Sequence, residues 1–178
     1  MTKTADDESV ELGQVVNYTI TGSVPNTNGF DTYSYEVSDY MSSGLTFNPS
    51  SLKVTIGTAV FTATDASAGV TITAGSPSNG FTVDIDMTKY QTTPGINGEV
   101  KIEYNGTVNT NAVTKIDENH AVLKYSNDPT DSTTKTENPP VIVKTFSAKI
   151  VIDKIKEGEE ATKLGEAVFV LKNATMVR

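Results

Sequence analysis

Apolar and polar residues alternate along much of the chain with a period of two, which is the period of a β-strand that buries one face. The clearest run lies at 81–87, where Phe81, Val83, Ile85 and Met87 alternate with polar residues. Similar runs recur at 16–20, 33–37, 54–56, 60–61, 70–72, 100–104 and 121–125, and turn-forming residues separate them. Many short strands at this spacing predict an all-β fold of the sandwich or barrel type.

A change in pattern near residues 128–140 predicts a domain boundary. The segment DPTDSTTKTENPP is polar and ends in two prolines, as a loop or linker does. We therefore expect a β-sandwich domain at 1–130, a linker at 131–144 and a fragment of a second β domain at 145–178. Two strands are predicted in this fragment, and two strands cannot bury a core alone. The fragment is thus either the start of a second domain or a strand pair docked on the first.

Composition and charge narrow the function classes. The formal net charge is −8, which argues against nucleic acid or an anionic membrane surface as a partner. No apolar stretch is long enough to span a membrane. The absence of cysteine excludes disulfides and a thiolate nucleophile, and a single histidine, His120, gives no basis for a Ser-His-Asp triad. Three carboxylates, Asp65, Asp84 and Asp86, raise the possibility of calcium, but their positions favour ordinary outward-facing residues, so no metal or cofactor is expected.

Three polar residues lie where the strand pattern makes them candidates for chemistry. Asp39 continues the inward phase of Tyr35 and Val37, and Asn127 continues the phase of Leu123 and Tyr125. Lys3 precedes the first strong strand. By alternation alone, each of these residues is more often a solvated residue at the rim of the sandwich than a buried one.

A family resemblance rests on the order of four blocks: VELGQVVNYTITGSVP, SYEVSDYMSSGLTF, KIEYNGTVN and NHAVLKYSNDP. Together they resemble the fimbrial isopeptide-forming domain of Gram-positive backbone pilins, over roughly residues 1–130. The tail segments FSAKIVIDKI and KLGEAVFVLKN are similar to the opening strands of a Cna B-type pilin domain. The resemblance implies an immunoglobulin-like, Cna A-like β-sandwich followed by a short piece of a second β domain.

The resemblance also assigns roles to the polar residues. It implies that the Lys3 amine bonds to the Asn127 side-chain amide, with Asp39 as the assisting acid. Burial disfavours charge, so a buried lysine becomes a neutral nucleophile and a buried aspartic acid can polarise the amide carbonyl. Lys154 occupies the position of a second bonding lysine, for which we expect no partner because the chain ends at Arg178.

The function implied is that of a structural module of a pilus shaft on the cell wall, with a self-made cross-link and no turnover of an external substrate. Its partners would be other pilin subunits in a sortase-assembled polymer, with a host surface as a further candidate. The main alternative is an adhesin or carbohydrate- or matrix-binding sandwich, in which Tyr33, Tyr40 and Tyr90 would contact the ligand. A hydrolase is a weaker alternative, because His120 has no evident catalytic partners.

Overall fold

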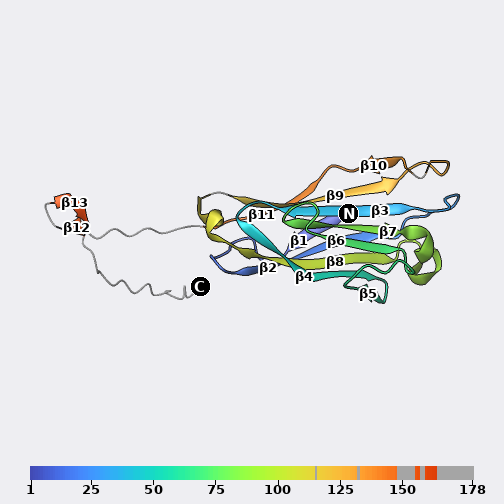
Figure 1. Ribbon diagram of the computed structural model, residues 1–178, viewed down its shortest axis with the longest axis horizontal. Helices are drawn as coiled ribbons and strands as arrows, with labels where there is room; N and C mark the ends of the chain where they lie inside the picture. The colour runs from blue at the N-terminus through green and yellow to red at the C-terminus, as the bar shows by residue number, and fades with distance from the viewer. Residues whose placement is uncertain (115, 132, 148–154, 157–158, 164–178) are drawn as a thin grey trace, which may run out of the picture. The chain divides into compact units, whose positions relative to one another are not determined.

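The computed structural model (Figure 1) divides the chain into two units, residues 1–148 and 149–178. It describes residues 1–114, 116–131, 133–147, 155–156 and 159–163. In the second unit, β12 (Ile155–Lys156) pairs antiparallel with β13 (Glu159–Lys163). Lys154 lies outside the described residues, so its expected lack of a bonding partner stays a prediction, as does the assignment of this tail to a Cna B-type domain.

The first unit is a sandwich of two antiparallel sheets, as the alternation predicted. The first sheet has the order β1-β2-β8-β4-β5. Its strands are β1 (Thr2–Ala5), β2 (Val15–Ser23), β4 (Leu45–Ile56), β5 (Ala59–Phe61) and β8 (Glu99–Val108). The second sheet has the order β10-β9-β3-β7-β6, and β11 also pairs with β9. Its strands are β3 (Ser34–Met41), β6 (Val70–Ala74), β7 (Gly80–Asp86), β9 (Asp117–Ser126), β10 (Lys135–Glu137) and β11 (Val141–Thr145).

Three short helical turns complete the described secondary structure: η1 (Met87–Tyr90), η2 (Gln91–Gly95) and η3 (Thr110–Thr114). Among the described residues, none of these turns has the length or the apolar character to cross a membrane.

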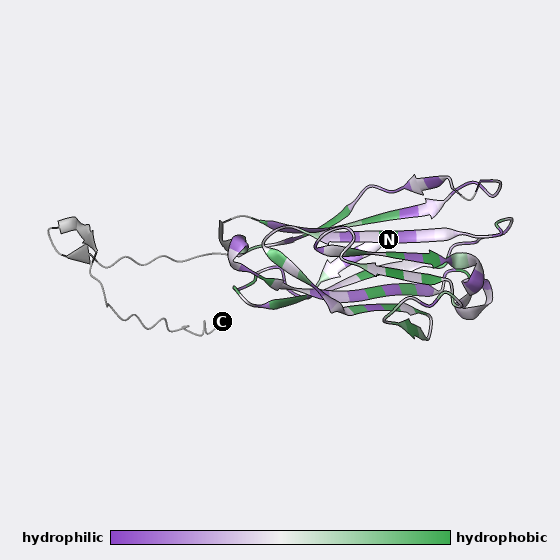
Figure 2. Cartoon of the chain, viewed as in Figure 1, coloured by the Kyte–Doolittle hydropathy of each residue, from purple (hydrophilic) through white to green (hydrophobic). Residues whose placement is uncertain are grey.

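The core lies between the two sheets and is built from the inward residues of each strand. Hydrophobic and hydrophilic residues alternate along β8, for example (Figure 2). Val16 and Val54 of the first sheet and Val83 and Ile85 of the second have no exposed surface. Burying such side chains stabilises the fold by about 25 cal/mol per Å² of apolar surface, which fixes the register because a one-residue slip would expose the whole set.

The expected linker at 131–144 is wrong in part, because it contains two strands of the second sheet. Lys135 pairs with Ser126, and Val141 pairs with Ala121, so β10 and β11 both extend β9. In β11, the segment VIVKT places Val143 in the core. This short alternation forms a strand, although the residues before it are polar and include two prolines. The first unit therefore ends beyond the boundary that we expected at residue 130.

Pairing at the edge brings the two ends of the first unit together. Strand β1 contacts β11, and Ser9 forms a parallel bridge with Phe146. Backbone hydrogen bonds run from Val10 N to the Phe146 carbonyl and from Phe146 N to the Glu8 carbonyl. An edge strand of one sheet thus lies beside an edge strand of the other, and this arrangement closes one side of the sandwich.

Candidate functional site

Strand β1 places Lys3 in the interior. Its outward neighbours are Thr2 and Thr4, and it lies opposite Ile20 of β2. The Lys3 side chain has no exposed surface, and its Nζ lies 2.5 Å from Oδ2 of Asp39. A buried amine in contact with a buried carboxyl group is rare in structural cores, because charged groups lose their hydration there.

Strand β3 supplies Asp39, which lies opposite Phe81 of β7 and Ala121 of β9. Its side chain is fully buried. Besides the contact with Lys3, Oδ2 accepts a hydrogen bond of 2.7 Å from the hydroxyl of Tyr104 on β8. The other oxygen, Oδ1, has no hydrogen-bond partner among the described residues. The inward position predicted for Asp39 is therefore confirmed.

Strand β9 adds a residue that the sequence interpretation missed, Asn119. It lies opposite Met41 and has no exposed surface. Because Asp39 pairs with Ala121, two residues further along β9, Asn119 and Asp39 are diagonal neighbours on one face of the sheet. Asn119 Nδ2 donates a hydrogen bond of 3.1 Å to the Tyr104 hydroxyl, and Oδ1 has no hydrogen-bond partner among the described residues.

These four residues, Lys3, Asp39, Tyr104 and Asn119, are called the Lys3 cluster below. The cluster contains an amine, a carboxyl group, a hydroxyl and a primary amide, drawn from both sheets. They form a continuous chain of contacts from Lys3 Nζ through Asp39 Oδ2 and Tyr104 Oη to Asn119 Nδ2.

Burial shifts the pKa values of Lys3 and Asp39 in the directions that favour their neutral forms. Loss of hydration lowers the pKa of Lys3 to about 8, although the nearby Asp39 opposes this change. Loss of hydration also raises the pKa of Asp39, against the opposing effect of Lys3. The pKa of Tyr104 is raised well above its ordinary value by burial and by Asp39, so its hydroxyl keeps its proton. The direction of the first two shifts favours a neutral amine beside a neutral acid.

Aromatic rings enclose the Lys3 cluster. Tyr18 stacks on Tyr104 with a centroid distance of 5.5 Å, and Phe81 meets Tyr104 edge-on at 4.8 Å. The Lys3 amine lies 5.7 Å from the Tyr18 ring centroid and 5.9 Å from that of Tyr104. Apolar walls of this kind exclude water, which strengthens every electrostatic interaction inside them.

The expectation that Asn127 points inward is wrong. Its side chain is exposed, and its Nδ2 donates a hydrogen bond of 2.6 Å to Oγ1 of Thr136. The inward phase of β9 changes near its end: Leu123 is buried, but beyond Tyr125 it is Ser126 that is buried, where its Oγ accepts a hydrogen bond from Ser34 N. Asn127 lies eight residues beyond Asn119, about 25 Å along the strand, so it is far from the cluster.

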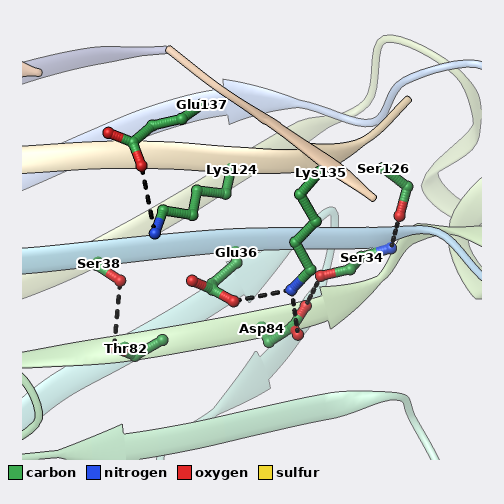
Figure 3. A network of polar contacts seen from close by, with 9 residues as sticks. All are labelled: Ser34, Glu36, Ser38, Thr82, Asp84, Lys124, Ser126, Lys135 and Glu137. Carbon is green, nitrogen blue, oxygen red and sulfur yellow. Dashed lines mark hydrogen bonds and ion pairs between the residues drawn. The ribbon is translucent and has the colours of Figure 1, made fainter. Parts of the chain in front are cut away.

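A second group of lysines and carboxylates lies on the outer face of the second sheet (Figure 3). The Lys135 amine is 2.8 Å from Glu36 Oε2 and 3.5 Å from Asp84 Oδ2, and Lys124 is 3.2 Å from Glu137. The contacts of Lys135 tie β10 to β3 and β7. The Lys135 and Glu36 side chains are 26% and 22% exposed, so water reaches this group.

The remaining sequence candidates lie apart from the Lys3 cluster. Tyr33 and Tyr90 are buried, whereas Tyr40 is 41% exposed and stacks on His120 at 4.7 Å. His120 in turn contacts Glu118. Within the part of the chain that the structure describes, no three His, Cys, Asp or Glu residues gather in a metal-binding arrangement.

Comparison with known proteins gives a family match that covers most of the first unit. The model for the Gram-positive pilin backbone subunit 2, Cna-B-like domain, matches residues 12–129. This family is Cna-B-like, whereas we expected a Cna A-like domain over this segment. No curated protein sequence matches the chain.

Solved structures with a similar fold include two pilins and a collagen-binding surface protein. The pilus backbone protein RrgB of Streptococcus pneumoniae is 24% identical with a TM-score of 0.57, over 72% of this chain and 52% of that one. The major pilin SpaD of Corynebacterium diphtheriae is 17% identical with a TM-score of 0.57, over 79% of this chain and 33% of that one. The collagen-binding subdomain of the Enterococcus faecalis surface protein ACE is 14% identical with a TM-score of 0.55, over 81% and 94%.

These likenesses concern the fold, and the chain spans about half of the RrgB structure that it matches. The family match covers more than half of this chain. The chain belongs to the Gram-positive pilin backbone family.

Proposed function

We propose that this chain is a structural module of a pilus shaft, and that an amide bond between Lys3 and Asn119 cross-links its β-sandwich. The observation that carries the proposal is the buried contact of Lys3 with Asp39, next to the buried amide of Asn119. The roles implied for Lys3 and Asp39 are kept. The partner amide is reassigned from Asn127 to Asn119, because Asn127 is exposed and distant.

The proposed reaction needs only the groups of the cluster. The neutral Lys3 Nζ attacks Cγ of Asn119, the bond from Cγ to Nδ2 breaks, and one ammonia leaves. Asp39 takes part as the acid and base, a role that contributes about 10²- to 10⁴-fold in other systems. Folding holds the reactants together, which removes about 7–11 kcal/mol of the barrier in well-oriented reactions. The reaction occurs once per molecule, so the chain is not a turnover enzyme.

The cross-link has a mechanical purpose in this proposal. It would join β1, an edge strand of the first sheet, to β9 of the second sheet. A pulling force could then not peel β1 away or separate the two sheets at this point. An amide also survives reducing conditions, and the chain has no cysteine with which to form a disulfide.

The proposed setting is outside the cell, in a pilus attached to the cell wall. Its proposed partners are other pilin subunits in a sortase-assembled polymer, since the family is that of backbone pilins. A host surface remains a further candidate partner.

A matrix-binding adhesin is the second candidate function. It is favoured by the exposed Tyr40, which borders a hollow also lined by Ser38, Thr82 and Val122 on the outer face of the second sheet. An exposed aromatic ring can contact a sugar or an extended peptide. Binding of collagen or of an arrayed glycan by the chain, lost in Tyr40→Ala, would support this function, and no binding would exclude these ligands.

The cross-link is tested by the intact mass of the folded chain. We expect a mass one ammonia below that of the sequence. Asn119→Ala should have its full sequence mass, because no electrophile remains for Lys3. Asn127→Ala is the matched control and should still lose one ammonia. An unmodified mass for the folded wild-type chain would reject the cross-link, and loss of the modification only in Asn127→Ala would restore the original assignment.

A further inference from the structure

The hydroxyl of Tyr104 lies between the acid and the amide of the Lys3 cluster. It donates to Asp39 Oδ2 at 2.7 Å and accepts from Asn119 Nδ2 at 3.1 Å. The bond to Tyr104 is the only hydrogen bond of the Asn119 side chain within the described residues. The tyrosine therefore contacts the nitrogen that would leave as ammonia.

The proposed cross-linking reaction requires one proton to move from lysine to this nitrogen. A neutral amine and a primary amide together become a secondary amide and ammonia, so Lys3 Nζ loses a proton that Nδ2 gains. Asp39 touches the amine, but no hydrogen bond joins Asp39 directly to the Asn119 side chain among the described residues. Tyr104 is hydrogen-bonded to both of these side chains.

We propose that Tyr104 is a catalytic residue of the cross-linking reaction, which passes the proton from Asp39 to the leaving nitrogen of Asn119. This inference rests on the proposed function of the Lys3 cluster. Once Nζ has attacked, Nδ2 is no longer conjugated with a carbonyl, so it becomes a base that can accept a proton. In one concerted relay, Nζ gives a proton to Asp39 Oδ2, Asp39 gives one to Tyr104 Oη, and Oη gives its own to Nδ2; the bond from Cγ to Nδ2 then breaks and ammonia leaves.

The number of protons is balanced in this relay. Asp39 and Tyr104 each gain one proton and lose one, so both end as they began. The phenol rotates its hydrogen from Asp39 toward Nδ2 and never becomes a tyrosinate. This fits a hydroxyl held in an apolar site, where a negative charge is disfavoured.

A neighbouring tyrosine serves as a matched control. Tyr18 is buried and stacks on Tyr104, but its hydroxyl contacts Thr145 Oγ1 at 3.3 Å and lies outside the chain of contacts described above. Removing either hydroxyl leaves a phenylalanine ring in the same aromatic stack. Only the loss of the Tyr104 hydroxyl would interrupt the path of the proton.

The experiment follows ammonia loss with time in the full chain. Wild type, Tyr104→Phe and Tyr18→Phe are made by cell-free translation, translation is stopped, and intact mass is recorded at intervals. Circular dichroism of each product confirms the β fold. We expect Tyr104→Phe to react about 10²- to 10⁴-fold more slowly than wild type, the range of general acid–base catalysis, and Tyr18→Phe to stay within about threefold.

Two non-natural residues separate proton transfer from packing. At position 104, 4-fluorophenylalanine fills the space of the hydroxyl but has no proton to pass, whereas 4-aminophenylalanine has one. We expect the fluoro variant to stay slow and the amino variant to recover most of the rate. These variants also decide the matter if Tyr104→Phe does not fold.

The outcomes distinguish this inference from the proposed function. A wild-type chain that folds and loses no ammonia rejects the cross-link itself, and with it the role of Tyr104. A wild-type chain that reacts, with the fluoro variant equally fast or the amino variant as slow as the fluoro variant, leaves the cross-link standing and overturns the role of Tyr104 alone.

Discussion

Lysine meets a carboxyl group in two very different places in this molecule. Inside the sandwich, Lys3 contacts Asp39 at 2.5 Å with both side chains fully buried. On the outer face of the second sheet, Lys135 contacts Glu36 at 2.8 Å with both side chains partly exposed (Figure 3). The residue types and distances are similar, so the difference in behaviour comes from the surroundings.

The pKa values of the two lysines shift in opposite directions. Loss of hydration dominates at Lys3 and lowers its pKa to about 8. At Lys135, partial burial is outweighed by the hydrogen bond to Glu36 and the charges of Asp84 and Glu36, and the pKa is raised. The outer pair therefore remains an ion pair, whereas the inner pair is driven toward neutral groups that can react. Burial thus separates a contact that is an ion pair from a contact whose groups are shifted toward their neutral forms.

The largest difference between the two places should be seen when the acid is removed. Asp39→Ala should stay folded, keep its full sequence mass and lose up to about 5 kcal/mol of stability, the value that chain entropy gives for a cross-link of this span. Asp84→Ala, in the outer group, should form the cross-link as wild type does. Intact mass and denaturant unfolding check both variants. Full ammonia loss in Asp39→Ala would mean that the reaction does not need Asp39.

A smaller effect is expected in the pH dependence of stability. In Asn119→Ala, Lys3 remains an amine whose pKa is about 8 when folded and the ordinary 10.5 when unfolded. Between these values the unfolded chain binds more protons than the folded chain, so stability should rise with pH, by about 3 kcal/mol at most.

The control for the pH experiment is Lys3→Met, which also lacks the cross-link but has no amine to titrate at position 3. Urea unfolding at several pH values from about 7 to about 11, a range that brackets the two pKa values, compares the variants. Equal slopes in both would show that the Lys3 pKa is not lowered in the folded chain.

The smallest effect is expected at the outer lysine. Lys135→Met should change the stability by about 1 kcal/mol or less, because exposed ion pairs contribute little, and that change should shrink in high salt. Ammonia loss should be unaffected. Unfolding curves at low and high salt provide the measurement. A loss of stability as large as that of Asp39→Ala would show that the buried and the outer lysine do not differ in their contribution.

The sequence predicted the features that depend on regular alternation. The period-2 runs located the core strands, and the inward phase of Asp39 followed from Tyr35 and Val37. Alternation failed for Asn127, because the phase of β9 changes just before it. Read in the other direction from Ala121, the same alternation reaches Asn119, so the signal was present at the opposite end of the strand.

Tyr104 could not be recognised in the same way. In the run Val100, Ile102 and Tyr104 it looks like a core residue, and its ring is indeed in the core. Its proposed role depends on where the hydroxyl points, which is set by the packing of β8 against the other sheet. Strands β10 and β11 were missed because their pairing with β9 joins residues that a polar segment separates in the sequence.

The most direct test of the central claim is a peptide map of the folded wild-type chain after protease digestion, with mass spectrometric fragmentation. A bond between Lys3 and Asn119 predicts one branched peptide that contains both residues and is one ammonia lighter than its two parts. Separate linear peptides with unmodified Lys3 and Asn119, or a branched peptide that joins Lys3 to Asn127, would contradict the account.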